Sequence, residues 1–167
     1  DARFRYVDNV DMRSRFAYYR FSEGVRDFGT QVKQLPQAEM DKLFQEAGIN
    51  GSIQRVMKAV SMLEGGFDSI NTYDTGFVSV GLIQFASLRA GAGSLGAVLL
   101  KQKADSPREF ESDFRRFGVD VSPAGQLIAL DPETGAETIG AAANSAIIRD
   151  KRLIAVFHRA GKLSRAF

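Results

Sequence analysis

Three polar residues in one short stretch could act together on a glycosidic bond. Glu64 closes a helical pattern, Asp74 follows ten residues later, and Ser79 stands five residues beyond Asp74. Cleavage of such an acetal needs one carboxylic acid that protonates the leaving oxygen. It also needs a carboxylate that activates water or stabilises the oxocarbenium-like transition state. The pattern predicts Glu64 as the general acid, Asp74 as the base or charge stabiliser, and Ser79 as the residue that positions water.

The two carboxyl groups are expected in unlike surroundings. Met62, Leu63 and Phe67 are apolar neighbours of Glu64 and could wall it off from water, which favours the protonated acid near neutral pH. Asp74 lies in a turn between two short segments rich in β-branched and aromatic residues. A turn is exposed, so we expect its carboxylate to stay ionised. Two carboxyl groups in different environments are what glycoside hydrolysis requires.

An inert interpretation of the same residues stays open. The run Y-D-T-G is also an ordinary hairpin turn, because Asp and Gly both accept turn geometry. Glu64 stands before Gly65 and Gly66, so it could simply end a helix, although its negative charge opposes the helix dipole there.

Residues beside the turn could bind sugar. Asn71, Thr72 and Tyr73 directly precede Asp74 and offer amide, hydroxyl and aromatic groups, which carbohydrate recognition uses. Gln84 could contact sugar or could be a structural amide that bonds to the backbone; the sequence leaves both open.

The composition argues against a metal site and against a catalytic triad. The chain has no Cys and a single His, His158, so a Ser-His-Asp triad and a multi-His or thiolate zinc site are nearly excluded. We therefore expect no cofactor, and we expect His158 at the surface or at an interface.

The stretch around these residues resembles a known superfamily. Glu64 followed by Y-D-T-G-F-V-S-V-G is similar to the active-site helix and hairpin of phage-type lysozymes. The spacing of Asp74, Ser79, Gly81 and Phe85 matches the D-G-R-G-Y-T-A-G-I-I-G-F run of chitosanases that share the lysozyme fold. The ending V-G-L-I-Q-F is similar to the G-L-M-Q of lytic transglycosylases. Ser79 stands where the phage enzymes usually have Thr.

This resemblance implies an α+β fold that is mainly α and lysozyme-like, with a small active-site hairpin and a second hairpin. It implies a glycosidase or lytic transglycosylase that cleaves β-1,4 linkages in peptidoglycan, in a secreted, periplasmic or phage-associated setting. The alternatives are a chitosanase and a non-catalytic cell-wall-binding or interaction domain with the same fold. The polysaccharide is the only partner that the resemblance names.

Size and charge limit the other functions. With 167 residues, 44% of them hydrophobic and 25% charged, the chain can bury the core of one domain. No apolar run approaches the length of a membrane span. The net charge of +2 comes without a basic tract, so nucleic acid is not an expected partner, and a mildly basic enzyme suits an anionic polymer better than cationic chitosan. The start at Asp1 suggests a piece of a longer chain with further domains.

Periodicity predicts the elements that position the site. Residues 1–34 are interpreted as a helical lead-in segment rich in Arg and aromatics, with Asp8 or Asn9 as its cap, and residues 35–167 as the catalytic domain. The helix that ends at Glu64 carries an apolar stripe and is expected to be the most buried one. Further helices are expected at 37–47, 94–103, 107–117, 141–148 and 153–160, the last ended by Gly161, with a hairpin over 127–139.

Overall fold

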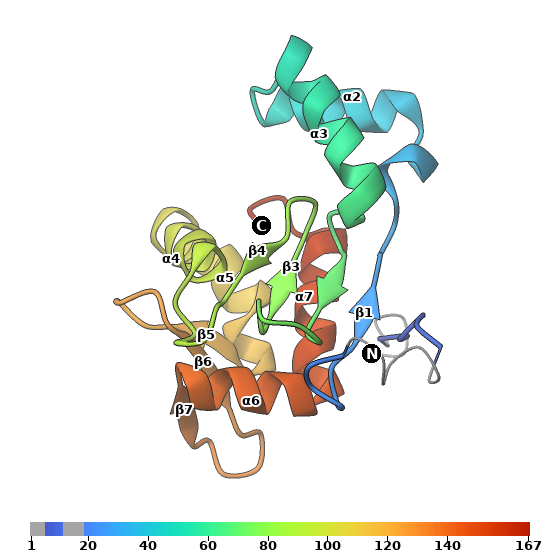
Figure 1. Cartoon of the computed structure of the whole chain (residues 1–167). Coiled ribbons are helices and arrows are strands. Elements are labelled where there is room, and N and C mark those ends of the chain that lie inside the picture. The colour runs from blue at the N-terminus through green and yellow to red at the C-terminus, as the bar shows by residue number, and fades with distance from the viewer. Residues whose placement is uncertain (1–5, 12–18) are drawn as a thin grey trace.

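The computed structural model describes residues 6–11 and 19–167, and within them the chain is α+β (Figure 1). The helices of the described part are α2 (Gln37–Glu46), α3 (Gly51–Glu64), α4 (Ser94–Asp105), α5 (Pro107–Asp113), α6 (Ala141–Arg149) and α7 (Lys151–Leu163), with 3-10 turns η2 (Val32–Gln34) and η3 (Arg115–Phe117). The strands are β1 (Arg26–Asp27), β2 (Ile70–Asn71), β3 (Ser79–Val80), β4 (Phe85–Ala86), β5 (Val119–Val121), β6 (Leu127–Leu130) and β7 (Glu137–Ile139). The expected α+β class is confirmed.

Two small antiparallel sheets organise the body of the molecule. The first sheet has the strand order β1-β2-β3-β4, and the second has the order β5-β6-β7. The second sheet contains the hairpin predicted over 127–139, with Ile128 opposite Ile139. β1 joins the first sheet as an edge strand through Asp27 opposite Ile70, which the sequence did not predict.

The main core lies between the second sheet and helices α4 to α7. Its largest fully buried side chains include Phe110, Phe114, Phe157, Leu99 and Ile154. The rings of Phe110 and Phe114 lie 5.5 Å apart, and those of Phe114 and Phe157 lie 5.8 Å apart, in tilted pairs that aromatic rings favour. Ile70 and Val80 of the first sheet belong to the same core, so both sheets are anchored to one body.

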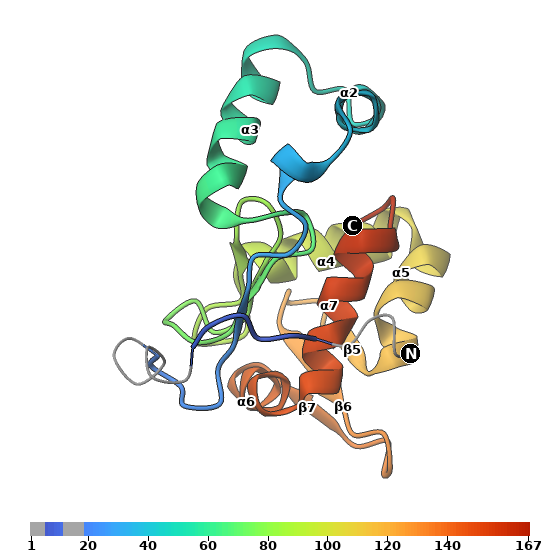
Figure 2. The ribbon, with the colours of Figure 1, turned by 90° about the vertical axis from the view of Figure 1, so that its right-hand side faces the viewer.

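Helices α2 and α3 form an arm that projects from this body (Figures 1 and 2). Two chain segments, 28–31 and 65–69, connect the arm to the first sheet. The arm has a small core of its own, made of Val32, Met40, Phe44 and Leu82. Leu82 comes from the connection between β3 and β4, so the base of the arm packs on the end of the first sheet.

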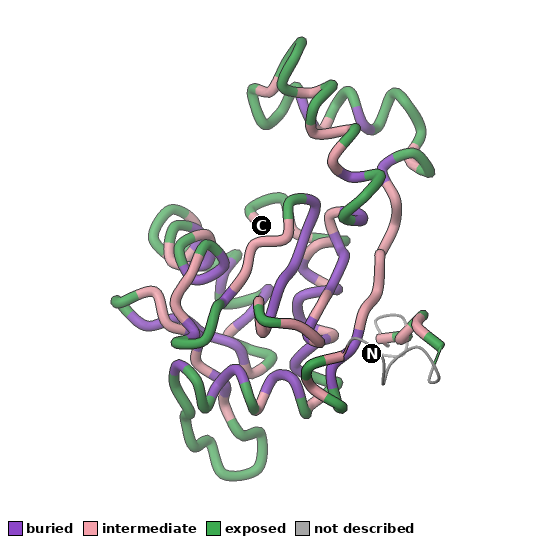
Figure 3. Tube along the Cα trace, viewed as in Figure 1, coloured by how far each residue is buried: buried purple, intermediate pink, exposed green. Residues whose placement is uncertain are grey.

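The expected burial of α3 is wrong. Ile53, Val56 and Leu63 of its apolar stripe are 59%, 61% and 76% exposed, and Ser61 is its only buried residue. The stripe is real, but α2 and Leu82 cover one side of it only, because the arm stands away from the body. Figure 3 shows the contrast between the exposed arm and the buried strands.

Glycine and proline set several helix limits as predicted. Pro107 occupies the first turn of α5, and Gly118 stops η3 in the left-handed conformation with φ 94°. Gly161, however, does not end α7, which continues to Leu163. A Cβ atom at Gly161 would lie 2.5 Å from the carbonyl oxygen of Phe67, so this glycine allows α7 to pack closely on residues 67–68.

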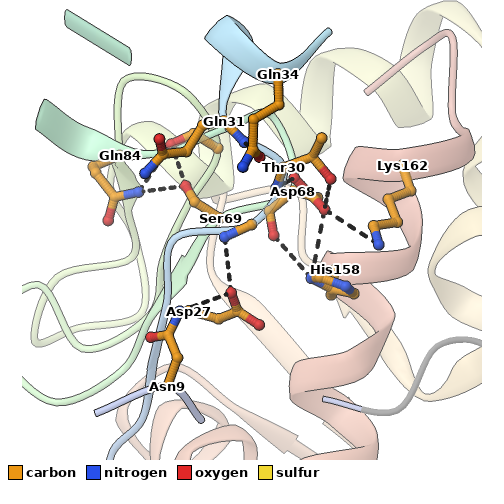
Figure 4. A network of polar contacts seen from close by, with 12 residues as sticks. Asn9, Asp27, Thr30, Gln31, Gln34, Asp68, Ser69, Gln84, His158 and Lys162 are labelled. Carbon is orange, nitrogen blue, oxygen red and sulfur yellow. Dashed lines mark hydrogen bonds and ion pairs between the residues drawn. The ribbon is translucent and has the colours of Figure 1, made fainter. Parts of the chain in front are cut away.

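A polar network fastens the base of the arm to α7 (Figure 4). Asp68, which is 2% exposed, accepts a hydrogen bond from the backbone N–H of Thr30 over 2.6 Å, and Lys162 Nζ lies 3.7 Å from its Oδ2. His158 Nδ1 lies 3.0 Å from the carbonyl oxygen of Asp68. The surface position expected for His158 is wrong, because this contact holds the ring inside, at 7% exposure.

The lead-in segment is described in part. Residues 6–11 are not helical, although Asp8 Oδ1 accepts from the N–H of Val10 in the manner of a turn. Residues 1–5 and 12–18 of the expected helical segment lie outside the described residues. Its remaining part, 19–34, contains strand β1 and the 3-10 turn η2 and no α-helix. None of the described helices is long and apolar enough to cross a membrane.

Candidate active site

The register of the first sheet lines up four residues, which we call the outer row: Arg26, Asn71, Ser79 and Ala86. Asn71 lies opposite Arg26 on one side and opposite Ser79 on the other, and Ser79 lies opposite Ala86. Residues directly opposite each other share a face of the sheet. The alternate row contains Ile70 and Val80 of the core, so the outer row faces away from the core.

Asp74 is held over this row by two hydrogen bonds. Asn71 Nδ2 donates to Asp74 Oδ2 over 2.9 Å, and the backbone N–H of Gly76 donates to Asp74 Oδ1 over 2.8 Å. Asn71 is itself oriented, because its Oδ1 accepts from the N–H of Tyr73 at 3.2 Å. The carboxylate of Asp74 therefore has a defined direction although it stands in a loop.

Gly76 brings Asp74 and Ser79 together. A Cβ atom placed on Gly76 would lie 2.5 Å from Ser79 Oγ and 3.1 Å from Asp74 Oδ1. The same position is 3.6 Å from the Cβ of Ala86, so the loop between β2 and β3 folds back over the outer row. This loop covers Ser79, which is 4% exposed. A side chain at position 76 would collide with the hydroxyl of Ser79, so the loop can lie this close to β3 only with a glycine there.

Glu64 lies at the other end of β2. It is the last residue of α3 and is exposed, while the loop with Asp74 follows β2 at the far end of the strand. Gly65, at φ 114°, and Gly66 fix this end of the helix, and Gly66 N–H donates to the carbonyl of Phe28 over 2.8 Å. The structure thus joins Asp74, Asn71 and Ser79, and it places Glu64 outside that contact.

The apolar wall expected around Glu64 is wrong for two of its three residues. Met62 and Leu63 are 66% and 76% exposed. Phe67 is half-buried against the core of the arm. The side chains of Met62 and Leu63 point into solvent because nothing on the body reaches this face of α3.

The other expected sugar-binding residues differ in accessibility. Thr72 is fully buried, and its Oγ1 accepts from the N–H of Val25 over 3.1 Å, which fastens β1 to β2. Gln84 Nε2 donates to Ser69 Oγ and to the carbonyl of Gly81, both over 2.9 Å, the bonds of a structural amide. Asn71, which belongs to the outer row, and Tyr73, which lies near Arg26 at its edge, are both half-buried.

An aromatic and cationic cluster at the edge strand was not predicted. Arg26 lies 4.2 Å from the ring centroid of Phe28, and its Nη1 donates to the hydroxyl of Tyr73 over 3.3 Å. The ring of Tyr73 also stacks on Tyr19 at 4.4 Å. The sequence signal for this cluster was the alternation of Arg and aromatic residues before position 34. Only the pairing of β1 with β2 shows that Arg26 and Phe28 lie beside Tyr73.

Other charged features lie elsewhere. A surface cavity of about 370 Å³ is lined by Arg115, Asp131, Asp150 and Arg152 among others, and none of the outer row lines it. Asp120 raises the pKa of Arg115 through a hydrogen bond and ion pair, and Arg152 lowers the pKa of Asp150 in the same way. No group of three His, Cys, Asp or Glu in the described part of the chain could hold a metal ion.

Comparison of the chain with protein-family models, with curated proteins and with solved structures finds no match. The functional argument therefore rests on the residues and their geometry.

Proposed function

We propose that this chain is a glycosidase of the lysozyme-like superfamily, a hydrolase or lytic transglycosylase, that cleaves β-1,4 linkages of peptidoglycan. The observation that carries the proposal is the meeting of Asp74 and Ser79 over Gly76. A carboxylate and a hydroxyl that both lie beside the same glycine are suited to bind a water molecule together. The second carboxyl group of the proposal is Glu64, the last residue of the preceding helix α3.

In the proposed mechanism, Asp74 acts as the base. Asn71 and the N–H of Gly76 hold its carboxylate, so that the oxygen near Ser79 can accept a proton from water. Ser79 Oγ, which lies beneath the loop, is proposed to help hold this water beside Asp74. Because these residues are fixed before substrate binds, little reorganisation is needed in the transition state.

Glu64 is proposed to protonate the leaving oxygen. It stands at the base of the arm, at the opposite end of β2 from the loop of Asp74, so the sugar and the attacking water would lie between the two carboxyl groups. An inverting glycosidase needs that room, with carboxyl groups roughly 6.5–9.5 Å apart, against about 5–5.5 Å in a retaining enzyme. We therefore expect inversion at the anomeric carbon if water, rather than the substrate, is the attacking group.

The experiment compares the wild type with Glu64→Gln and Asp74→Asn in clearing of a purified peptidoglycan suspension. Both variants should lose roughly a hundredfold or more of the rate and stay folded, since general acid and base groups contribute about that much. Glu39→Gln is the matched control, because Glu39 is an exposed residue in the first turn of α2. Clearing by Glu64→Gln at the wild-type rate would remove Glu64 from the mechanism.

Chitosan is tested in parallel. Cleavage of chitosan without clearing of peptidoglycan would assign the chain to the chitosanases, whose motif spacing it shares. Retention on insoluble peptidoglycan without any cleavage would assign it to the wall-binding modules. Analysis of the products separates hydrolysis from transglycosylation, because only hydrolysis leaves a free reducing end.

A further inference from the structure

Arg26 has a position in the outer row that the proposed mechanism does not use. It pairs directly with Asn71, which pairs with Ser79, so the three side chains emerge from the same face of three neighbouring strands. Strands in a sheet lie about 4.8 Å apart, which puts Arg26 roughly 10 Å from Ser79 along the row. That separation is about the length of a disaccharide.

The guanidinium of Arg26 is held by aromatic rings rather than by a carboxylate. Its Cζ lies 4.2 Å from the ring centroid of Phe28 and 5.8 Å from that of Tyr73. Among the residues that the structure describes, no Asp or Glu forms an ion pair with it. Arg115 and Arg149, by contrast, pair with Asp120 and Glu23. Arg26 is half-buried, so its charge is oriented and incompletely compensated.

We propose that Arg26, Phe28 and Tyr73 form a subsite for a carboxylate-bearing amino sugar of the substrate. This inference rests on the proposed function and specifies the substrate further. A guanidinium binds a carboxylate through two parallel hydrogen bonds, and the rings of Phe28 and Tyr73 hold the guanidinium in place for it. The carboxylate would come from the acidic substituent or peptide that distinguishes peptidoglycan from chitin and chitosan.

The same charge disfavours the alternative substrate. Chitosan carries ammonium groups, and a cation fixed about one disaccharide from the water-binding pair would repel them. Tyr73 contributes to the orientation, because its hydroxyl accepts the hydrogen bond from Arg26 Nη1. The subsite thus selects for negative charge and against positive charge.

The experiment uses soluble glycan fragments of peptidoglycan in two forms, with free carboxyl groups and with the same groups converted to neutral methylamides. Affinity and kcat/KM are measured for the wild type and for Arg26→Gln. The variant should lose about tenfold or more on the carboxylate form and change less than twofold on the amide form, as expected for a lost hydrogen bond to a charged group. Arg108→Gln, at an exposed site on α5, is the matched control for the change in net charge.

Each outcome bears on the proposal. Equal losses on both forms would show that Arg26 only supports the fold and would overturn the proposal. An unchanged preference of Arg26→Gln for the carboxylate form would also overturn it. A wild type that binds neither form would do the same. If Arg26→Gln does not fold, Arg26→Lys replaces it, since it keeps the charge and the stem but cannot bind a carboxylate in the same paired manner. Binding that depends on Arg26 without cleavage would support the subsite and contradict the proposed activity.

Discussion

Asn71 Nδ2 and Asp74 Oδ2 are joined by a hydrogen bond of 2.9 Å that crosses the start of the loop between β2 and β3. The bond connects the candidate base to a residue of the sheet, and through the sheet register to Ser79. A carboxylate in a loop would otherwise choose among several rotamers. The hydrogen bond from Asn71 therefore fixes the direction of the Asp74 carboxylate, although Asp74 lies in a turn.

Replacing Asn71 by Ala should lower kcat on soluble peptidoglycan. The lost bond is one to a charged group, worth about 1.5–3 kcal/mol, so we expect a fall of roughly tenfold to a hundredfold. Unfolding temperature should change little because Asn71 is half-buried and not in the core. Asn50→Ala is the control, since Asn50 is exposed and makes no side-chain capping bond to α3. Wild-type kcat in Asn71→Ala would show that Asp74 needs no such support.

Gly76→Ala should separate Asp74 from Ser79. The new methyl group would lie 2.5 Å from Ser79 Oγ and 3.1 Å from Asp74 Oδ1, so at least one of them must move. Gly76 is not among the residues with positive φ, so its backbone accepts Ala. A displacement near 1 Å at the reacting groups can cost up to about a hundredfold in rate, and we expect a loss of that order in kcat with a small loss of stability.

Gly48→Ala should have the opposite effect to Gly76→Ala, a loss of stability without a loss of activity. No described atom lies within 4 Å of a Cβ at Gly48, but the φ of 68° at this position strains any residue other than glycine. We expect a fall of about 1 kcal/mol in the free energy of unfolding and no change in kcat. Full activity in Gly76→Ala would contradict the close approach of Asp74 and Ser79.

Local signals in the sequence predicted where helices and strands lie better than they predicted what packs against them. Pro107 and Gly118 marked the limits of the α5–η3 segment because each acts through its own backbone geometry. The loop carrying Asp74 and its relation to Ser79 also followed from short-range spacing. Gly161 was misjudged because its role is a contact with residues 67–68, which are about 90 positions away in the chain.

Burial was the least predictable property. The stripe of Ile53, Val56 and Leu63 has the period of a buried helix, but periodicity cannot tell whether a partner surface exists. His158 was expected at the surface or at an interface, whereas its ring is buried and lies against the carbonyl of Asp68. Arg26 could not be placed at all until β1 was seen to pair with β2. Each of these depends on contacts between distant segments.

Gly66→Ala should disturb the junction of the arm with the first sheet. A Cβ at this position would lie 1.9 Å from the carbonyl oxygen of Thr30 and 3.0 Å from Asp68 Oδ1. The backbone of Thr30 would have to shift, and overpacking of this kind costs about 1–3 kcal/mol. Urea unfolding measures the loss. Gly135→Ala gives the baseline, because its Cβ would meet no described atom within 4 Å and the change costs only the strain of its φ of 70°, about 1 kcal/mol. A smaller loss in Gly66→Ala than in Gly135→Ala would contradict this close contact.

Asp150 should stabilise α7 in a pH-dependent way. Its Oδ1 accepts from the N–H of Arg152 as the N-cap of the helix, and the Arg152 side chain lowers the pKa of Asp150 below its ordinary value of 3.8. A group whose pKa is lower in the folded state stabilises the protein above its unfolded pKa, and this contribution is lost as the pH falls through the folded pKa.

Two variants separate the cap from the charge of Asp150. Asp150→Ala should lose about 1 kcal/mol at pH 7, the usual value for an N-cap, whereas Asp150→Asn keeps a capping oxygen and should lose less. The difference between wild type and Asp150→Asn should shrink as the pH falls below 3.8, where protonation removes the ion pair with Arg152. Urea unfolding at pH 7 and at about pH 3 measures both. A wild-type advantage over Asp150→Asn that is as large at the lower pH would show that the charge of Asp150 contributes nothing to it.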